Sequence, residues 1–451
     1  MRASGTSNRQ ILALAVPATA ALAADPLLSL VDTALVGRLG PTPLAALGID
    51  AAVFTTVFWV FNFLTWGTTA EVARLRGAGR GDEAAGHALQ ALWLAVGCGT
   101  LVTAALLAAG PRILDLMGAR GAVTAPALTY LRIRAFAAVP VLIVAVGHGA
   151  FRGVQDTRTP LAVTAAANGV NAAASWLLIY PAGLGVAGAA YGTVLAQTGA
   201  AAAFLVLARR RFPLPALAVD PRAMRAIVRI SRDLFLRTAA LLAGLLVATA
   251  AAARLGTVAV AAHQIARELW LLLAMVLDGF AIAGQALVGT ALGAGDRARA
   301  AADARRLTWW GLGCGLVLGA AYLALAVPLP RVFTADEAVL AQVSTVWLLI
   351  AALQPVGGVV FVLDGILMGA GDFRFLFAST AVAALAGLAP LAVLAVVADW
   401  GLLGVWTGMV ALMTIRLAAT VARVRGGRWL SSSGRTGGSI GRGTRPRPAA
   451  R

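Results

Sequence analysis

Apolar residues along the chain gather into twelve long runs of about 16 to 28 residues. Most runs are close to the ~20 residues that a helix needs to cross the hydrocarbon core of a bilayer. They are continuous and rich in Ala, Leu and Val, whereas the strands of a membrane β-barrel would alternate over about ten residues. The pattern therefore predicts membrane-spanning helices. Their approximate cores are residues 11–36, 45–70, 87–109, 126–150, 160–180, 184–208, 234–253, 259–283, 306–327, 338–363, 375–397 and 400–420.

The second half of the chain repeats the first at a constant offset of 216 residues. Each half holds six runs, an even number, so the two halves share one orientation and are related by an axis along the membrane normal. The predicted fold is an all-α integral membrane protein with twelve transmembrane helices in two six-helix lobes. The matched pairs include Arg38-Leu39-Gly40 with Arg254-Leu255-Gly256, Gly77-Ala78-Gly79 with Gly293-Ala294-Gly295, Gly97-Cys98-Gly99 with Gly313-Cys314-Gly315, and Gly149, Gly153, Asp156 and Arg158 with Gly365, Gly369, Asp372 and Arg374.

Four parts follow from this organisation. Residues 1–208 are expected to form the N-terminal lobe, residues 209–232 a cytoplasmic interlobe linker, and residues 233–424 the C-terminal lobe. Residues 425–451 form a tail rich in Gly, Ser, Arg and Pro, which has no apolar periodicity and is expected to be disordered. We expect the tail to be dispensable, with contact to anionic membrane lipid as the alternative.

The formal net charge of +18 comes entirely from arginine, because all 37 basic residues are of this type. The arginines stand at the ends of the apolar runs and in the tail, as topology signals do, so nucleic-acid binding is not expected. They are concentrated in alternate connections, which places both termini in the cytoplasm and the chain in the plasma membrane as a multi-pass protein. Without lysine the chain cannot form a Walker A loop, so ATP hydrolysis by that route is excluded.

Duplicated lobes around a central cleft suit alternating access, which favours transport over catalysis. A membrane enzyme acting on polyprenyl lipids would need clustered acids to hold a metal and a diphosphate, and the sequence has no such cluster. The three histidines are too scattered for a metal site. We therefore expect no enzymatic activity, no metal and no cofactor.

Two stretches carry a resemblance to a known family. Residues 30–37 (LVDTALVG), preceded by Pro17, resemble the first helix of the MATE (multidrug and toxic compound extrusion) family. Residues 278–289 (DGFAIAGQALVG) resemble its DNA-damage-inducible F branch, as does the pair Asp364-Gly365. The likeness extends from about residue 9 to residue 424. It implies a cation-coupled antiporter for organic, often cationic, compounds, built from two six-helix bundles that form a V.

The first apolar run contains ionisable residues, which are costly at membrane depth and normally mark an ion or substrate path. Asp25, Ser29 and Asp32 follow the spacing i, i+4, i+7 and share one helix face. Pro17 and Pro26 each remove one backbone hydrogen bond and can let the helix bend. A bent helix with buried carboxylates can couple protonation to shape, so we expect Asp32 to bind the coupling ion with Asp25 as its helper.

Two alternatives concern this carboxylate. Asp32 could instead form an interfacial pair with Arg38, although the resemblance favours a functional role. The coupling ion could be sodium, but sodium needs several oxygen ligands at once and a proton needs only one carboxylate. Ser175 replaces an aspartate that the family commonly has in the fifth helix, which leaves this lobe short of negative charge. A proton is therefore the expected ion.

A second polar stripe runs along the fifth apolar run, where Thr164, Asn168, Asn171 and Ser175 recur at helical spacing. From the residues alone, hydrogen bonding between helices explains this stripe as well as a binding role does. In the resembling family an asparagine here precedes a Gly-Ala-Ala stretch with a threonine, and Asn171 and Thr193 match it. The resemblance therefore places the stripe at the wall of the N-lobe cavity.

Polar residues in the corresponding helix of each lobe complete the candidate site. Asn62 and Asp278 are repeat equivalents, and Gln264 lies in the same helix as Asp278. All three are expected to line the cavity, although Gln264 with its neighbours Arg267 and Glu268 could equally be structural partners within the membrane. Asp364 is interpreted as part of a cluster that caps a loop with Asp372 and Arg374.

The function predicted from these observations is that of a monomeric antiporter that exports small organic compounds, cationic or amphipathic, in exchange for protons, or alternatively sodium. The competing hypothesis is a flippase for lipid-linked compounds or oligosaccharides with the same two-lobed architecture. Anionic headgroups would favour arginines inside the cleft. The sequence has few arginines within its apolar runs, so export of a soluble compound is favoured.

Overall fold

The computed structural model describes residues 6–212 and 219–431, and every regular element in these ranges is a helix. By length and composition, eleven helical segments there can cross a membrane. A twelfth span is formed by α5 (Thr124–Ala135) and α6 (Ala138–Gly153), which belong to a pair bent by 50°. The prediction of twelve spans is confirmed.

The twelve spans fall into two sets of six. The first set comprises α1 (Asn8–Gly37), α2 (Pro41–Val60) with α3 (Phe63–Gly77), α4 (Gly81–Leu116), α5 with α6, α7 (Arg158–Ile179) and α8 (Val186–Arg211). The second comprises α9 (Pro221–Arg254), α10 (Thr257–Gly293), α11 (Arg297–Ala324), α13 (Glu337–Gly369), α14 (Phe373–Val382) with α15 (Ala389–Val397), and α16 (Gly401–Arg425). Short elements are η1 (Gly121–Val123), α12 (Pro328–Arg331), the π-helical η2 (Ala383–Leu388) and η3 (Arg428–Leu430).

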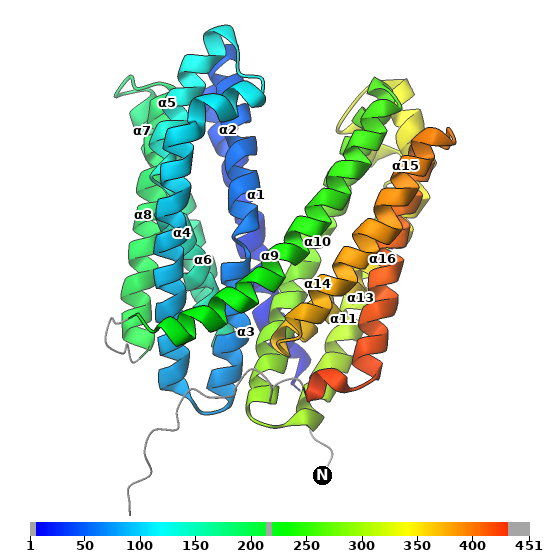
Figure 1. Cartoon of the computed structure of the whole chain (residues 1–451). Coiled ribbons are helices and arrows are strands. Elements are labelled where there is room, and N and C mark those ends of the chain that lie inside the picture. Colours follow the sequence, from blue (N-terminus) through cyan, green and yellow to red (C-terminus); the bar gives the residue numbers. More distant parts are fainter. Residues whose placement is uncertain (1–5, 213–218, 432–451) are drawn as a thin grey trace, which may run out of the picture.

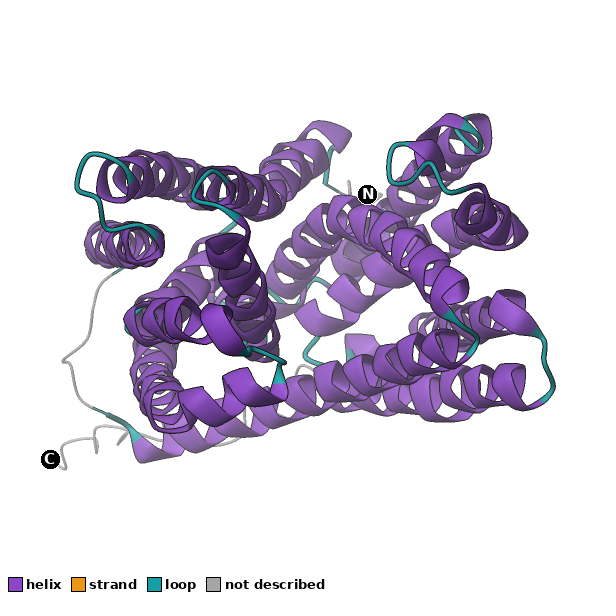
Figure 2. Ribbon diagram, turned by 90° about the horizontal axis from the view of Figure 1, so that it is seen from above, coloured by secondary structure: helices purple, strands orange, loops and turns teal. Residues whose placement is uncertain are grey.

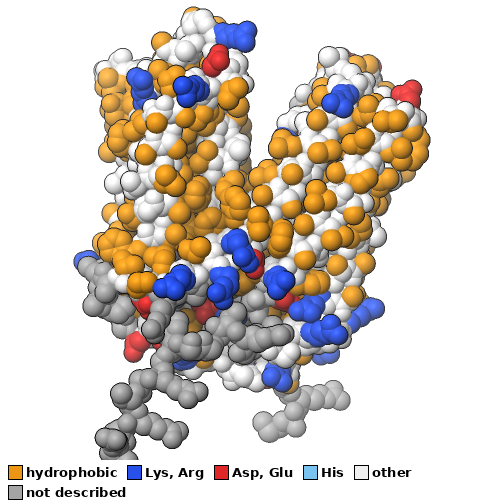
Figure 3. All heavy atoms as spheres, viewed as in Figure 1, with side chains coloured by type: hydrophobic (Ala, Val, Ile, Leu, Met, Phe, Trp, Pro, Cys, Tyr) orange, Lys and Arg blue, Asp and Glu red, His pale blue; other side chains and the backbone are white. Residues whose placement is uncertain are grey.

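The two sets of helices form two lobes that diverge at one end and meet at the other (Figure 1). A view from above shows the helices of both lobes and the loops that join them (Figure 2). In the space-filling view a groove separates the lobes at their open end and closes where they meet (Figure 3). The V of two six-helix lobes implied by the resemblance is confirmed.

Helix α9 connects the lobes. It begins at Pro221, within the segment 209–232 that was expected to be the interlobe linker, so most of this segment is helical. The helix crosses the lower part of the N-lobe, contacts α3 and α4, and rises into the C-lobe (Figure 1). Residues 213–218 of the expected linker and residues 432–451 of the expected tail lie outside the described part of the chain.

Equivalent glycines make equivalent helix contacts in the two lobes. A Cβ atom added to Gly149 would lie 2.7 Å from the Thr65 carbonyl oxygen, and one added to Gly365 would lie 2.2 Å from that of Ala281. Both members of each contact are separated from their counterparts by the repeat offset, since 365 − 149 and 281 − 65 are both 216. The repeat read from the sequence therefore reflects two lobes with the same helix packing.

A reciprocal pair of glycines lies where the lobes meet. Gly77 of α3 packs on the carbonyl of Thr290 in α10, and Gly293 of α10 packs on the carbonyl of Arg74 in α3. A Cβ atom at either glycine would lie 2.0 Å from the opposing oxygen. Because both contacts are repeat equivalents, the axis that relates the lobes passes through this crossing of α3 and α10. Glycine is required here for the two backbones to approach.

Hydrogen bonds also link the two lobes at the end of the molecule where they meet. The backbone N–H and the hydroxyl of Thr6, just before α1, donate to the two carboxylate oxygens of Asp303 in α11, at 2.6 and 2.9 Å. The Gln285 side chain of α10 donates to the Trp66 carbonyl of α3 at 2.6 Å. Asp303 and Gln285 are fully buried, so these bonds satisfy the carboxylate oxygens of Asp303 and the amide nitrogen of Gln285, which would otherwise be costly to bury.

Candidate functional site

The first candidate site lies between α1 and α7 in the N-lobe. Asp32 of α1 is buried, and the amide nitrogen of Asn171 lies 3.4 and 3.3 Å from its two carboxylate oxygens. The amide oxygen of Asn171 accepts the hydroxyl of Ser175 at 2.9 Å. Near the end of α7, the Tyr180 hydroxyl donates to the Leu35 carbonyl at 2.8 Å. Two residues of α7 and its C-cap, Tyr180, thus fix the side chain and backbone of α1 around this carboxylate.

Two prolines create the need for partners along α1. The helix is continuous through Pro17 and Pro26, and each ring leaves the carbonyl four residues earlier without its helical donor. The Thr157 hydroxyl lies 3.5 Å from the carbonyl freed by Pro17. The Asn168 side chain donates to the Ala24 carbonyl, two residues before Pro26, at 2.9 Å. Polar side chains in and before α7 therefore bond to the backbone of α1 near both prolines.

The remaining members of the α7 stripe contact other N-lobe helices. The Thr164 hydroxyl lies 3.3 Å from a ring nitrogen of His148 in α6. Ser175 packs on Gly192 of α8, where a Cβ atom would lie 2.3 Å from its hydroxyl oxygen. The neighbouring Thr193 is buried and donates to a carbonyl of its own helix at 3.1 Å. The stripe is thus brought together around Asp32 at one end and around His148 at the other.

Two further candidates from the sequence, Asn62 and Gln264, do not join this cluster. The side chain of Asp25 lies outside the described part of the structure. Asn62 lies in the turn between α2 and α3 rather than inside a continuous helix. Gln264 is exposed and donates to Glu268 at 3.3 Å, and Arg267 bonds the same carboxylate at 2.9 Å.

A second cluster, in the C-lobe, surrounds Asp364 of α13. Its carboxylate accepts a hydrogen bond from Arg237 of α9 at 2.6 Å and another from Arg416 of α16. Asp364 and Arg416 are almost completely buried. Asp278 of α10 is half-buried and lies close enough to act electrostatically on all three of these groups. The cluster joins four helices of this lobe through buried charges.

The interpretation of Asp364 as a loop-capping residue is wrong. Its partners lie on the membrane-spanning parts of α9 and α16, whereas Asp372 at the end of the helix bonds Arg423 at 2.6 Å. Spacing along the chain could not show this, because Arg416 is 52 residues and Arg237 is 127 residues away from Asp364. Only the packing of the helices brings the three side chains together.

The sequence analysis also missed a third acid. Asp50 of α2 is fully buried, and neither of its carboxylate oxygens has a hydrogen-bond partner within the described part of the chain. Arg134 of α5 acts electrostatically on both Asp50 and Asp32. A signal for it was present: Asp50 stands inside the apolar run 45–70, where an ionisable residue is as unusual as Asp32 is in the first run.

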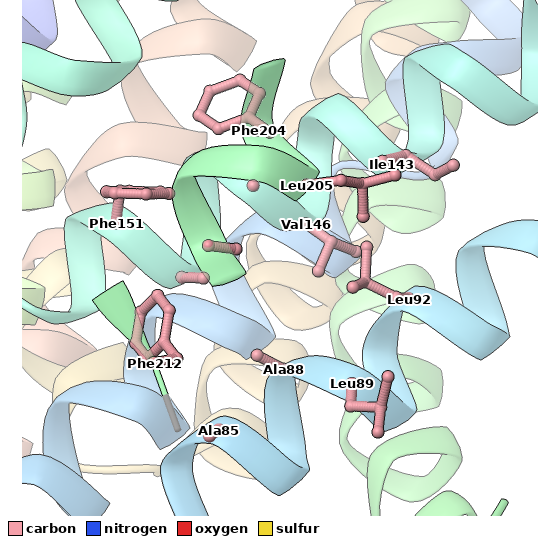
Figure 4. A pocket seen from close by; sticks show the side chains of 13 residues that line it. Ala85, Ala88, Leu89, Leu92, Ile143, Val146, Phe151, Phe204, Leu205 and Phe212 are labelled. Carbon is pink, nitrogen blue, oxygen red and sulfur yellow. The ribbon is translucent and has the colours of Figure 1, made fainter. Parts of the chain in front are cut away.

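A small apolar pocket lies elsewhere in the N-lobe, between α4, α6 and α8 (Figure 4). Its lining consists of Ala, Val, Leu, Ile and Gly residues together with Phe151, Phe204 and Phe212. No titratable side chain lines it.

The residues that the structure describes contain no group of three His, Cys, Asp or Glu side chains that could hold a metal ion. The chemistry of the site therefore rests on its carboxylates, amides and guanidinium groups.

Comparison with known proteins gives matches over nearly the whole chain. The MatE family model matches residues 17–177 and 234–394, once in each lobe. Protein DETOXIFICATION 44, chloroplastic, of Arabidopsis thaliana is 34% identical over 441 residues, which cover 94% of this chain and 84% of that protein. DNA damage-inducible protein F of Escherichia coli is 28% identical over 443 residues, covering 95% of each chain.

Solved structures match the fold as well. The crystal structure of MATE in the bent conformation has a TM-score of 0.85 with 22% identity, covering 95% of this chain and 96% of that one. An outward-facing conformation of a multidrug resistance MATE family transporter of the MOP superfamily has a TM-score of 0.83 with 22% identity, covering 94% and 96%. The two-lobed arrangement is thus the same in these chains.

Proposed function

The chain belongs to the MATE family, whose members are transporters rather than enzymes, and from this premise we propose that it exports small organic compounds in exchange for protons. The observation that carries this proposal is the buried carboxylate of Asp32, held by Asn171 inside a membrane-spanning part of the N-lobe. A titratable group at such a position is costly and marks an ion path.

The exchange follows from competition for this carboxylate. A proton or an organic cation can each neutralise Asp32, so the binding of one weakens the binding of the other. When the lobes open to one side, the proton enters and the cation leaves. When they open to the other side, the proton leaves and a new cation enters. The similar chains include a multidrug resistance transporter and a protein named for detoxification, which supports export of organic compounds.

The surroundings of Asp32 favour a proton over sodium. The nearest side-chain partner of the carboxylate is the amide nitrogen of Asn171, which is a donor, and the amide oxygen is occupied by Ser175. Sodium would need several oxygen ligands at once, and Ser175 stands where the family commonly has an aspartate. A proton needs one oxygen of one carboxylate.

The flippase alternative receives little support from the C-lobe. Anionic headgroups would need guanidinium groups free to bind them in the cleft. Arg237 and Arg416 are instead bonded to Asp364. Because each copy of the chain contains both lobes, we propose that a monomer surrounded by membrane lipid is sufficient for export.

Reconstitution tests this function. Purified protein in liposomes is given a pH gradient or a sodium gradient separately, and efflux of a panel of cationic, neutral and anionic organic compounds is followed. We expect the pH gradient to drive the transport of cationic compounds without sodium. A strict requirement for sodium, or transport of the anionic compounds alone, would refute the proposal.

The orientation of the chain is a separate proposal, in which both termini and the end where the lobes meet face the cytoplasm of the cell. Arginine side chains gather at that end on the face in Figure 3, as expected for the cytoplasmic side. In a background where Cys98 and Cys314 are replaced by alanine, single cysteines at Thr42 and Thr257 should react with an impermeant thiol reagent added outside. A cysteine at Gly81 should not react. Opposite labelling of Thr42 and Thr257 would refute the parallel arrangement of the repeats.

Replacing Asn171 with leucine should impair transport while folded protein still reaches the membrane. The change removes the donor to Asp32 and the acceptor for Ser175, and an unpartnered buried polar group costs about 1–3 kcal/mol. The control is Val170→Leu, since Val170 is half exposed on the same helix and contributes no polar group. Efflux and thermal unfolding are measured for both. Unchanged efflux in Asn171→Leu across all substrates would assign the stripe to helix packing alone.

A further inference from the structure

Asp50 and Arg134 lie on two N-lobe helices that pack together. Asp50 of α2 is completely shielded from solvent, and both of its carboxylate oxygens lack a hydrogen-bond partner in the described part of the chain. The Arg134 guanidinium of α5 lies 5.0 Å from the ring centre of Phe54, one helical turn after Asp50. It also donates to the Tyr130 hydroxyl at 3.3 Å, and its Nε atom is buried without a partner.

Arg134 links Asp50 to the site at Asp32, because it acts electrostatically on both carboxylates. Tyr130, one helical turn before Arg134 on α5, is influenced electrostatically by Arg134, Asp32 and Asp50. These last three residues form a charged triad. Besides α5, the helices packed against α2 are α1, η1 and α9. In the described ranges they bring no other charged side chain close enough to act on Asp50. The side chain of Asp25 is not among the described groups.

The charges of this triad do not balance when all three groups are ionised. Two carboxylates and one guanidinium leave one negative charge, in a region from which water is almost excluded. An uncompensated buried charge costs several kcal/mol, so it must be neutralised. Sodium is a poor candidate, because it needs several oxygen ligands at once, whereas a proton needs only one. A single bound proton restores the balance.

We propose that Asp50 is a second proton-binding site, which holds one proton in this conformation while Arg134 compensates the charge of Asp32. The hydrogen-bond partners of the two acids indicate which of them holds the proton. Asn171 donates to the carboxylate of Asp32 and stabilises its ionised form, whereas Asp50 receives no donor. The ionised acid is therefore Asp32, and the protonated acid is Asp50.

This inference deepens the proton-coupled export proposed above and rests on it. With Asp50 protonated, Arg134 is the counter-ion of Asp32 alone, so a proton or an organic cation arriving at Asp32 must displace that interaction. When Asp50 loses its proton, Arg134 is shared between two carboxylates. The occupancy of Asp50 thus sets how strongly Asp32 binds its ligands. Export would then depend on two carboxylates in this lobe.

Infrared spectroscopy tests the proposal without a transported compound, since protonated carboxyl groups have a carbonyl stretch distinct from that of carboxylates. In purified protein at neutral pH we expect one buried protonated carboxyl group. Asp50→Asn should remove it. Asp32→Asn should also remove it, because one carboxylate then remains for one guanidinium. Arg134→Gln should increase the signal about twofold, because both acids must then be neutral.

The control is Asp115→Asn, in which an exposed carboxylate at the end of α4 is replaced, and this variant should keep the wild-type signal. Thermal unfolding identifies variants that do not fold. If a variant fails, Asp50→Glu, which keeps the carboxyl group, provides a second measurement and should retain the signal. Absence of the signal in the wild type would overturn the proposal. Its persistence in Asp50→Asn, or in Asp32→Asn with Asp50 intact, would overturn it as well.

Transport of ethidium in liposomes separates failure of this inference from failure of the proposed function. We expect Asp50→Asn to change the pH profile of ethidium efflux. A pH-driven wild type with an unchanged profile in Asp50→Asn would refute only the role of Asp50. A wild type that ignores the pH gradient would refute the function itself.

Discussion

Replacing Asp32 with asparagine should abolish pH-driven efflux while the protein still inserts into the membrane and folds. Asparagine keeps the shape of the side chain and can still pair with Asn171, but it fixes the neutral state. The site then has no proton to exchange, so the pH gradient can no longer drive export. We expect a loss of at least ~100-fold, as when a titratable group essential to proton transfer is removed. The measurement is efflux from liposomes under an imposed pH gradient.

The matched control for this change is again Asp115→Asn, an identical substitution at an exposed carboxylate, which should retain full activity. Thermal unfolding shows whether Asp32→Asn still folds. Full pH-driven efflux in Asp32→Asn would contradict the assignment of the coupling proton to this carboxylate.

Alanine at Gly77 or Gly293 should force apart the helices that close one end of the molecule. At each position the added Cβ would lie 2.0 Å from a backbone oxygen of the other lobe, and no change of rotamer can relieve that contact. Overpacking of this kind costs about 1–3 kcal/mol. The closed end should therefore open in a larger fraction of molecules, and efflux should fall by about tenfold for a cost near 1.4 kcal/mol. Distances between spin labels at Gly81 and Arg297 would record the opening.

The repeat supplies controls for this prediction. Gly97 and Gly313 are equivalent positions in α4 and α11, and a Cβ atom at either one meets no atom within 4 Å. Alanine there should leave spin-label distances and efflux unchanged, and it should stabilise the helix slightly, because alanine has the higher helix propensity. If Gly77→Ala and Gly97→Ala behaved alike, the crossing of α3 and α10 would not control closure.

Much of the fold was predictable because it depends on patterns of residues that can be read directly from the sequence. The lengths of the apolar runs set twelve spans, and matched glycines such as Gly149 and Gly365 revealed the repeat, since close helix contacts need glycine in both lobes. The polar stripe of the fifth run was visible at helical spacing. Its partners were not, because the bond between Asn171 and Asp32 depends on how α7 packs on α1 across 139 residues of sequence.

The buried charges were predictable only in part. Spacing marks Asp32 and Asp50 as unusual residues in apolar runs, but it cannot tell that Arg134 lies near both of them. In the same way, Asp364 stands near the end of an apolar run, and its two arginine partners come from helices that are distant in sequence. Charge pairing across a lobe depends on tertiary packing, which a single sequence does not display.

The most direct test of proton-coupled export is to follow protons and solute in the same liposomes. A pH indicator and a transported fluorescent cation are recorded together, with no sodium present, for the wild type and for Asp32→Asn. We predict that in the wild type protons and the cation move in opposite directions with a fixed ratio, and that both fluxes disappear together in Asp32→Asn. Movement of the cation without a counterflow of protons, or coupled fluxes that persist in Asp32→Asn, would contradict the account.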